Sequence, residues 1–238
     1  RYSYHDPVET YQTNVMGSLN VLEAIRTCSS VRAAIMVTTD KCYDNKERTE
    51  PYREEDALGG YDPYSSSKAC AELLISSYRN SFFADETSAV IASVRAGNVI
   101  GGGDWSTDRL IPDIIKARND KAPLQIRSPN AIRPWQHVLD PLHGYLMLAE
   151  QCFSVGHDYA QAWNFGPLEE GLKPVEWIVN YFADSWPEFS WQHDVQLHPH
   201  EATILKLDCS KAHDLLRWKA QWSISESLEK IKEWVQSF

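Results

Sequence analysis

The sequence predicts an α/β fold organised around a parallel sheet. In the first part of the chain, helical patterns alternate with short, unbroken apolar runs, and polar residues follow each run directly. Unbroken apolar runs are typical of strands that are covered on both faces, and their alternation with helices indicates crossover connections between parallel strands.

The first predicted element is a helix that begins at about Pro7. Asp6 is suited to cap it, Pro7 is suited to its first turn, and apolar side chains recur at every third or fourth position. These apolar positions are Val8, Tyr11, Val15, Leu19, Leu22 and Ile25. We expect this face of the helix to be buried.

Two strands and a second helix follow. Residues 33–38 and 89–95 are apolar runs that predict buried strands, and they are separated by a polar loop at 45–62 and a helix at 64–83. The apolar face of that helix is predicted to comprise Ala71, Leu74, Ile75, Tyr78 and Phe82.

The second half of the chain has shorter elements and is richer in Trp, Pro and His. Helices are expected near 109–119, 141–152, 174–185, 210–217 and 225–237. Short strands are expected near 124–127, 162–165 and 191–198. We predict two domains, 1–100 and 101–238, and expect the second to be interleaved with the first.

The composition excludes several classes of partner. The formal net charge of -10 argues against nucleic acid or an anionic membrane, because binding to phosphates needs clustered Lys and Arg. The five cysteines are scattered and odd in number, which indicates reduced thiols. No run of about 18 apolar residues is present, and the first residues do not resemble a signal peptide. We therefore expect a soluble, cytoplasmic protein.

Polar side chains that could carry chemistry meet at one edge of the predicted sheet. Thr39, Asp40 and Lys41 follow the first strand, and residues 98–103 follow the second. The helix at 64–83 begins at the same edge, which is where open parallel sheets bind their ligands. We expect these groups to converge on one cleft.

Tyr64 and Lys68 lie four residues apart and share one face of that helix, about 5–6 Å apart at Cβ. A charge this close favours the phenolate, so it would lower the pKa of Tyr64 and let the phenol act as a base. The same spacing also occurs in helices whose tyrosine packs and whose lysine is solvated. The surrounding residues must decide between these interpretations.

Along nearly its whole length the chain resembles the extended short-chain dehydrogenase/reductases. The segments that carry the resemblance are 14–24, 38–43, 64–68, 95–105, 133–138, 163–167, 200–202 and 207–212. Lys41 points to the branch that acts on CDP-sugars, because the branch that acts on dTDP-sugars usually carries Glu there. The resemblance implies a Rossmann-like doubly wound parallel sheet and a smaller C-terminal α/β lobe that binds the substrate.

The reaction implied by the resemblance is the NAD-dependent dehydration of CDP-glucose to CDP-4-keto-6-deoxy-glucose. Hydride passes from C4 to NAD, water is eliminated across C5 and C6, and the hydride returns to C6. The implied partner is a nucleotide sugar, with neither nucleic acid nor a membrane. A homodimer or homotetramer is expected, because helices corresponding to 8–26 and 64–83 form a dimer bundle in many relatives.

The resemblance also implies roles for the residues at the sheet edge. Tyr64 would remove the proton of the C4 hydroxyl, Thr39 would bind that hydroxyl, and Lys68 would bind the cofactor ribose. Asp40 is suited to protonate the leaving C6 oxygen. Lys41 could take the C5 proton if it is buried beside Lys68 or the nicotinamide cation. The alternative is that Asp40 and Lys41 form only an ion pair at a strand end.

Binding residues follow from the same resemblance. The cofactor-binding set is Thr38, Tyr64, Lys68 and Ala96. The substrate-binding set is Asn98, Arg109, Leu110, Arg127, Arg133, His137, His200 and Glu201. Arginine binds a diphosphate through two oxygens at once, although Arg109 and Arg127 fit surface ion pairs equally well. Leu110 would lie near the base and His137 near the diphosphate. No metal site is expected, since a half-exposed strand explains the three histidines at 193–200.

One part of the family pattern is missing. The family begins with a strand and a Gly-rich turn that binds the NAD pyrophosphate, and the glycines at 101–103 follow a late strand instead. We therefore expect a fragment or a truncated protein that lacks roughly the first hundred residues of the pattern. Two other functions stay open, an epimerase or decarboxylase acting on another nucleotide sugar and a non-catalytic module that binds sugar nucleotides. Asp40 and Lys41 beside Tyr64 favour elimination over epimerisation.

Overall fold

The computed structural model describes residues 2–196 and 203–237. Its helices are α1 (Tyr2–His5), α2 (Pro7–Tyr11), the π-helical turn η1 (Gln12–Met16), α3 (Gly17–Thr27), α4 (Pro63–Phe82), α5 (Leu110–Asp120), α6 (Leu139–Ser154), α7 (Val175–Ser185), α8 (Ser210–Leu216) and α9 (Ile224–Gln236). Its strands are β1 (Ala33–Val37), β2 (Val90–Ala96), β3 (Asn98–Ile100), β4 (Leu124–Ile126), β5 (Ile132–His137), β6 (Ala162–Phe165), β7 (Leu172–Pro174) and β8 (Trp191–His193). Short 3₁₀ turns are η2 (Asp40–Cys42), η3 (His157–Tyr159) and η4 (Glu169–Gly171).

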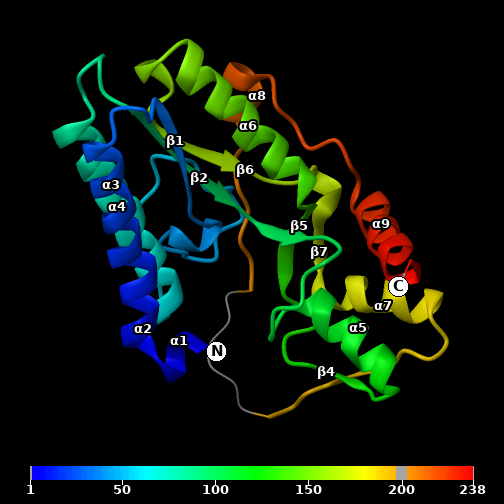
Figure 1. Cartoon of the computed structure of the whole chain (residues 1–238). Coiled ribbons are helices and arrows are strands. Elements are labelled where there is room, and N and C mark those ends of the chain that lie inside the picture. The colour runs from blue at the N-terminus through cyan, green and yellow to red at the C-terminus, as the bar shows by residue number, and fades with distance from the viewer. Residues whose placement is uncertain (1, 197–202, 238) are drawn as a thin grey trace.

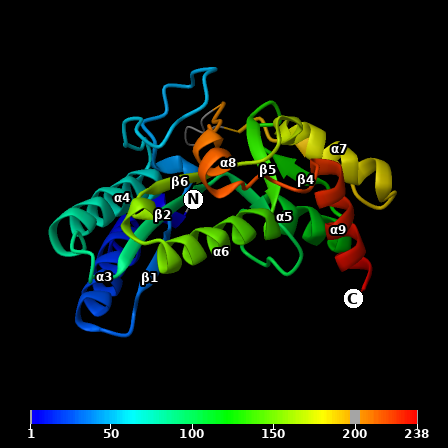
Figure 2. The same cartoon turned by 90° about the horizontal axis from the view of Figure 1, so that it is seen from above.

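The first sheet is parallel and has the strand order β1-β2-β6. Successive side chains of a strand point to opposite faces, and β2 uses both faces for packing. Val94 packs with Leu148 of α6, whereas Ile91 packs with Leu22 of α3 and Ile75 of α4. Helices α3 and α4 therefore cover one face and α6 covers the other (Figures 1 and 2). This arrangement confirms the predicted doubly wound α/β fold.

The second lobe contains two small sheets. Strand β5 pairs with β3 in parallel and with β7 in antiparallel, while β4 pairs with β8 in parallel. Helices α5, α7 and α9 share one apolar core (Figure 1). Its fully buried members include Ile114, Ile178, Val179, Phe182, Leu228 and Ile231. Because β6, α6 and α8 pack with the first sheet, the second half of the sequence contributes to both lobes. The domain boundary at residue 100 stays a prediction.

Burial of the first strand and the first helix is lower than predicted. Strand β1 is only half-buried and Val37 is 58% exposed, because β1 is an edge strand of its sheet. On the first helix, Leu22 is fully buried but Val8 is 65% exposed. That helix also changes to π geometry between α2 and α3, which the apolar spacing did not predict.

Some short strands were also missed. Strands β3, β5 and β7 have three, six and three residues, and their polar and proline content hides the strand pattern. Strand β8 covers Trp191–His193 and does not include residues 194–196 of the predicted strand, whereas residues 197–198 lie outside the described ranges. Within those ranges, no helix is both long and apolar enough to cross a membrane.

Candidate active site

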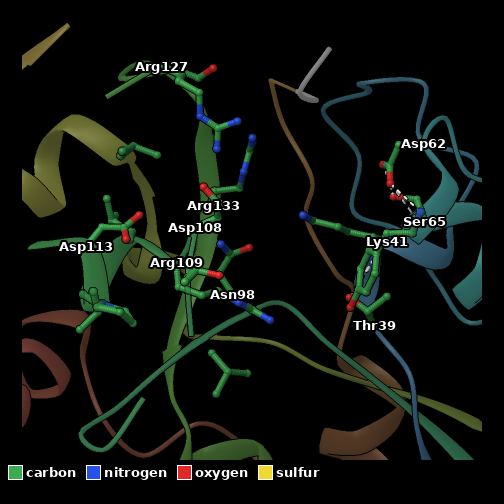
Figure 3. A pocket seen from close by; sticks show the side chains of 18 of the residues that line it. Thr39, Lys41, Asp62, Ser65, Asn98, Asp108, Arg109, Asp113, Arg127 and Arg133 are labelled. Carbon is green, nitrogen blue, oxygen red and sulfur yellow. Dashed lines mark hydrogen bonds between the residues drawn. The ribbon is translucent and has the colours of Figure 1, made fainter. Parts of the chain in front are cut away.

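A cavity of about 1520 Å³ is lined by residues of both lobes. One side, here called the tyrosine wall, comprises Thr39, Asp40, Lys41 and Tyr64. The other side, here called the arginine wall, comprises Asn98, Arg109, Leu110, Arg127 and Arg133. Figure 3 shows Thr39 and Lys41 on one side of the cavity and the three arginines on the other. The cavity thus brings together residues from the ends of β1 and β2, the start of α4 and the second lobe.

Asp40 is the buried acid of the tyrosine wall. It lies in turn η2 directly after β1, and only 2% of it is exposed. Thr39 Oγ1 donates a hydrogen bond to Asp40 Oδ1 at 3.0 Å, whereas Oδ2 has no partner among the described residues. Burial raises the pKa of Asp40, while the charge of Lys41 and the bond from Thr39 act in the opposite direction. A carboxyl group in such surroundings is suited to donate a proton.

Lys41 differs from Asp40 in exposure. Its side chain is exposed and extends toward the cavity (Figure 3). The predicted role of Lys41 as a base depends on burial, and the protein alone does not bury it. No ion pair between Lys41 and Asp40 is present in the part of the chain that the structure describes, so the alternative of a simple ion pair is not supported.

Tyr64 opens helix α4. The Asp62 carboxylate caps this helix, accepting hydrogen bonds from the backbone N–H groups of Tyr64 at 2.9 Å and Ser65 at 3.1 Å. Burial raises the pKa of Tyr64, while the charge of Arg109 and a hydrogen bond with Thr39 lower it. The predicted lowering of this pKa is therefore wrong, because burial and the charges of Asp40 and Asp62 outweigh the effects of Arg109 and Thr39.

Lys68 lies one turn further along α4 and is half-buried. Burial lowers the pKa of Lys68, and the charge of Glu72 acts in the opposite direction. No hydrogen bond or ion pair joins the Lys68 ammonium to another side chain within the described ranges. Its donors are therefore available to a ligand.

The arginine wall presents three guanidinium groups from different elements. Arg109 is the N-cap residue of α5 and is exposed, whereas Arg127 and Arg133 are half-buried. Asp108 has a left-handed φ of 59°, which bends the chain just before Arg109. Arg133 Nη1 donates a hydrogen bond to the carbonyl of Ile132 at 3.0 Å. Arginines on separate elements can approach one anionic ligand from several sides.

Several predicted residues lie apart from the cavity. His137 is buried and packs against Trp222, with ring centroids 4.4 Å apart, so it does not line the cavity. Thr38, Lys68 and Ala96 do not line it either, which separates the predicted cofactor contacts from the arginine wall. His200 and Glu201 lie outside the described residues.

Three polar residues that the sequence did not single out contact the elements of the site. Asn14, in the π-helical turn η1, donates a hydrogen bond to Ser67 Oγ at 2.9 Å, and Asn14 lines the cavity. Glu72 and Arg95 form a buried ion pair behind the tyrosine wall. The sequence could have indicated both residues of this pair. Glu72 follows Lys68 by one helical turn, and Arg95 is a charged residue within an apolar strand.

A metal centre finds no support in this part of the molecule. Across residues 2–196 and 203–237, no group of three or more His, Cys, Asp or Glu side chains could hold a metal ion. All five cysteines are free thiols.

The parallel sheet, with Tyr64 and Lys68 on the helix that begins at its carboxyl edge, fits a Rossmann-like short-chain dehydrogenase/reductase. The chain belongs to the GDP-mannose 4,6 dehydratase family, whose family model matches residues 1–231. It is 49% identical over 239 residues to the CDP-glucose 4,6-dehydratase of Salmonella typhimurium, and the match covers 98% of this chain. It covers 67% of the relative, so the chain spans about two thirds of the relative's length.

Solved structures share the fold. The dTDP-glucose 4,6-dehydratase from Streptomyces venezuelae, determined with NAD and TYD bound, superimposes with a TM-score of 0.82 at 19% identity, covering 99% of this chain and 69% of that one. The UDP-glucuronic acid 4-epimerase from Bacillus cereus, determined with UDP-glucuronic acid and NAD, gives 0.80 at 21% identity, covering 95% and 68%. A dehydratase and an epimerase share this fold, so only the site can distinguish the two reactions.

Proposed function

We propose that this chain forms the catalytic part of an NAD-dependent dehydratase, a hydro-lyase that converts CDP-glucose to CDP-4-keto-6-deoxy-glucose. One observation carries the proposal: a buried carboxyl group, Asp40, shares a cavity wall with the phenol of Tyr64. An epimerase needs only a base such as the Tyr64 phenol for its redox step, whereas elimination of water also needs an acid that protonates the leaving oxygen. The identity to a CDP-glucose 4,6-dehydratase supports CDP-glucose as the substrate.

The residues present fit a bound dinucleotide in part. The Lys68 ammonium is half-buried with available donors, which suits the hydroxyl groups of a ribose. The Thr38 hydroxyl fits less well, because it already donates to Glu72 and to the carbonyl of Val94. We assign Tyr64 and Lys68 to the NAD site and keep Ala96 as a proposed neighbour. NAD supplies the hydride acceptor and the hydride donor when it is bound.

Tyr64 acts as the base for the oxidation step. Its oxygen takes the proton of the C4 hydroxyl, and Thr39 orients that hydroxyl by hydrogen bonding. A phenol whose pKa is raised by burial is a strong base once it is ionised, but few molecules are ionised at neutral pH. The charge of Arg109 and the bond with Thr39 offset part of this cost. A further positive charge near Tyr64 would increase the ionised fraction.

Asp40 and Lys41 carry out the elimination. The 4-keto group acidifies the C5 proton, Lys41 removes it, and Asp40 protonates the C6 oxygen as water leaves. The raised pKa of Asp40 keeps more of this carboxyl group protonated than in an exposed aspartate. A substrate that fills the cavity would shield Lys41 from water, which the protein alone does not do. C6 then receives the hydride that left C4, and the Lys41 ammonium returns a proton to C5.

The arginine wall holds the nucleotide diphosphate. Arg109, Arg127 and Arg133 can bind phosphate oxygens through two N–H groups each. Asn98 lies at the start of β3 and offers an amide to the same ligand. Leu110, at the start of α5, would lie near the nucleobase of the bound nucleotide. The two walls would therefore bind opposite ends of one nucleotide sugar.

We also propose that the protein acts as a homodimer or homotetramer in the cytoplasm. Helices η1, α3 and α4 expose Met16, Val21 and Leu73 at 48%, 49% and 58%. Apolar side chains exposed along neighbouring helices favour pairing with a second copy. Sedimentation velocity tests this directly, and a monomer at micromolar concentration would contradict it.

The function is tested by incubating the protein with CDP-glucose and NAD and recording the absorbance of a 4-keto sugar after addition of base. We expect signal with CDP-glucose and its loss in Tyr64→Phe. Signal with a dTDP- or GDP-sugar but not with CDP-glucose would overturn the assignment of cytosine as the nucleobase of the substrate. Absence of binding to any nucleotide sugar would favour a non-catalytic module.

A further inference from the structure

A buried ion pair lies directly behind the tyrosine wall. Glu72 of α4 and Arg95 of β2 approach within 2.8 Å, and their side chains are only 2% and 3% exposed. A buried pair is weak evidence for stability, because desolvating two charges costs about as much as their attraction returns. The surroundings of this pair indicate a more specific task.

The Glu72 carboxylate accepts hydrogen bonds from side chains of β2 and from the residue that follows β1. Side chains alternate along β2, so Ser93 and Arg95 both point to the face that α4 covers. Ser93 Oγ donates to Glu72 Oε2 at 2.9 Å, and Arg95 Nη2 donates to the same oxygen. Thr38 Oγ1 donates to Glu72 Oε1. Burial raises the pKa of Glu72, but these bonds and the Arg95 charge bring it below its ordinary value. Glu72 is therefore an anion.

The network holds the turn of the tyrosine wall at both ends. Thr38 precedes the segment 39–42 and is bonded to Glu72. Tyr43 follows that segment, and its hydroxyl accepts a hydrogen bond from Arg95 Nη1 at 2.9 Å. The same guanidinium group thus joins the far end of the turn to the carboxylate on α4. Moving α4 relative to the turn would break these buried bonds.

Glu72 also faces Lys68. The two residues are one helical turn apart on α4 and share a face. The Glu72 charge counteracts the burial that lowers the pKa of Lys68. The other group acting on Lys68 is the Cys42 thiol of turn η2. Burial raises the pKa of Cys42 well above its ordinary value, so this thiol is neutral. Glu72 is therefore the anion that accompanies Lys68.

We propose that Glu72 and Arg95 are positioning residues of the active site, which fix turn η2 against helix α4 and keep the Lys68 ammonium charged. The expected effect on turnover rests on the function proposed above. The expected effect on Lys68 does not.

The first test measures kcat and KM in Glu72→Gln, together with its thermal unfolding. Misplacement of reacting groups by about 1 Å costs on the order of 100-fold in rate. We expect kcat to fall by about 100-fold while the KM for CDP-glucose changes by less than about threefold, since the arginine wall is untouched. If this variant does not fold, Glu72→Gln combined with Arg95→Met leaves no buried unpaired charge. A folded variant with a lower melting temperature and unchanged kcat would overturn the positioning role.

The second test follows Lys68 itself and needs no substrate. Only a neutral amine reacts with acetic anhydride, so the acylation rate of Lys68 against pH, read by peptide mass spectrometry, reports its charge. We expect the midpoint to fall by about one pH unit in Glu72→Gln. In Glu72→Asp, which keeps the charge, the midpoint should stay near that of the parent protein. An unchanged midpoint in Glu72→Gln would overturn the charge role.

Glu188→Gln is the matched control. It removes the partner of Arg118 in a pair at 2.7 Å, with side chains 25% and 39% exposed, in the second lobe. We expect neither kcat nor the Lys68 midpoint to change. If the parent protein dehydrates no nucleotide sugar, the proposed function fails, and the acylation midpoints still decide whether Glu72 controls Lys68.

Discussion

The two walls of the cavity are built differently. On the tyrosine wall, Asp40 is 2% exposed and accepts a bond from Thr39, and the buried network of Glu72 lies behind it. On the arginine wall, Arg109 is exposed and Arg133 is half-buried. Proton transfer needs groups fixed to within fractions of an ångström, whereas a diphosphate can be gathered by long side chains. Changes in the tyrosine wall should therefore lower kcat, and changes in the arginine wall should raise KM.

The largest expected effect comes from Tyr64→Phe. It removes the proposed base without changing the shape of the ring, so kcat should fall by about 10³–10⁴-fold. Formation of the 4-keto product from CDP-glucose measures it. Tyr78→Phe, on the same helix but bonded to Glu23, is the control and should stay within about twofold of the parent. Equal activity of Tyr64→Phe and the parent would exclude the phenol as the base.

Asp40→Asn should lower kcat by about 10²–10³-fold, because the amide cannot protonate the leaving oxygen. The same change should stabilise the fold by about 1 kcal/mol at pH 7, since it removes a buried carboxyl group whose ionisation is disfavoured. Full turnover in Asp40→Asn would remove this residue from the mechanism.

The stability gain of Asp40→Asn should depend on pH. A raised folded-state pKa means that the contribution of Asp40 to stability is present at low pH and lost as pH rises through that pKa. The difference in melting temperature between variant and parent should therefore shrink as pH falls toward about 4, the ordinary range of aspartate. A difference that does not change with pH would show that Asp40 is not the cause.

A smaller effect is expected on the arginine wall. Arg133→Lys keeps the charge but loses the fork that binds two oxygens, so KM for CDP-glucose should rise about tenfold with little change in kcat. Steady-state kinetics measure both constants, and Arg118→Lys in the second lobe serves as the control. A fall in kcat at unchanged KM would instead assign Arg133 to the chemistry.

The smallest effect is expected far from both walls. Glu188→Gln removes a partly exposed ion pair with Arg118, which contributes little to stability because water and salt screen it. Thermal unfolding at low and high salt measures it. If Glu188→Gln lowered the melting temperature as much as Glu72→Gln, burial would not explain any difference in stability between the two ion pairs.

Much of the fold follows from local pattern. The apolar run at 89–95 predicted the fully buried strand β2, and the spacing of Ala71 and Ile75 predicted helix α4. Strands β5 and β7 were not predicted from the sequence, because Arg133 and Pro134 interrupt the apolar pattern. Pairing between distant segments stabilises these strands instead.

The sequence by itself determined the parallel order of elements and the gathering of Thr39, Asp40 and Tyr64 at one strand edge, since strand ends and helix starts are local features. Only the tertiary structure decided how deeply these groups are buried, and burial raises the pKa of Asp40. Burial raises the pKa of Tyr64, whereas the spacing from Lys68 had predicted a lower pKa. Lys41, by contrast, is exposed. Burial depends on what packs from elsewhere in the chain, as Glu72 and Arg95 do behind this wall, and no local spacing records it.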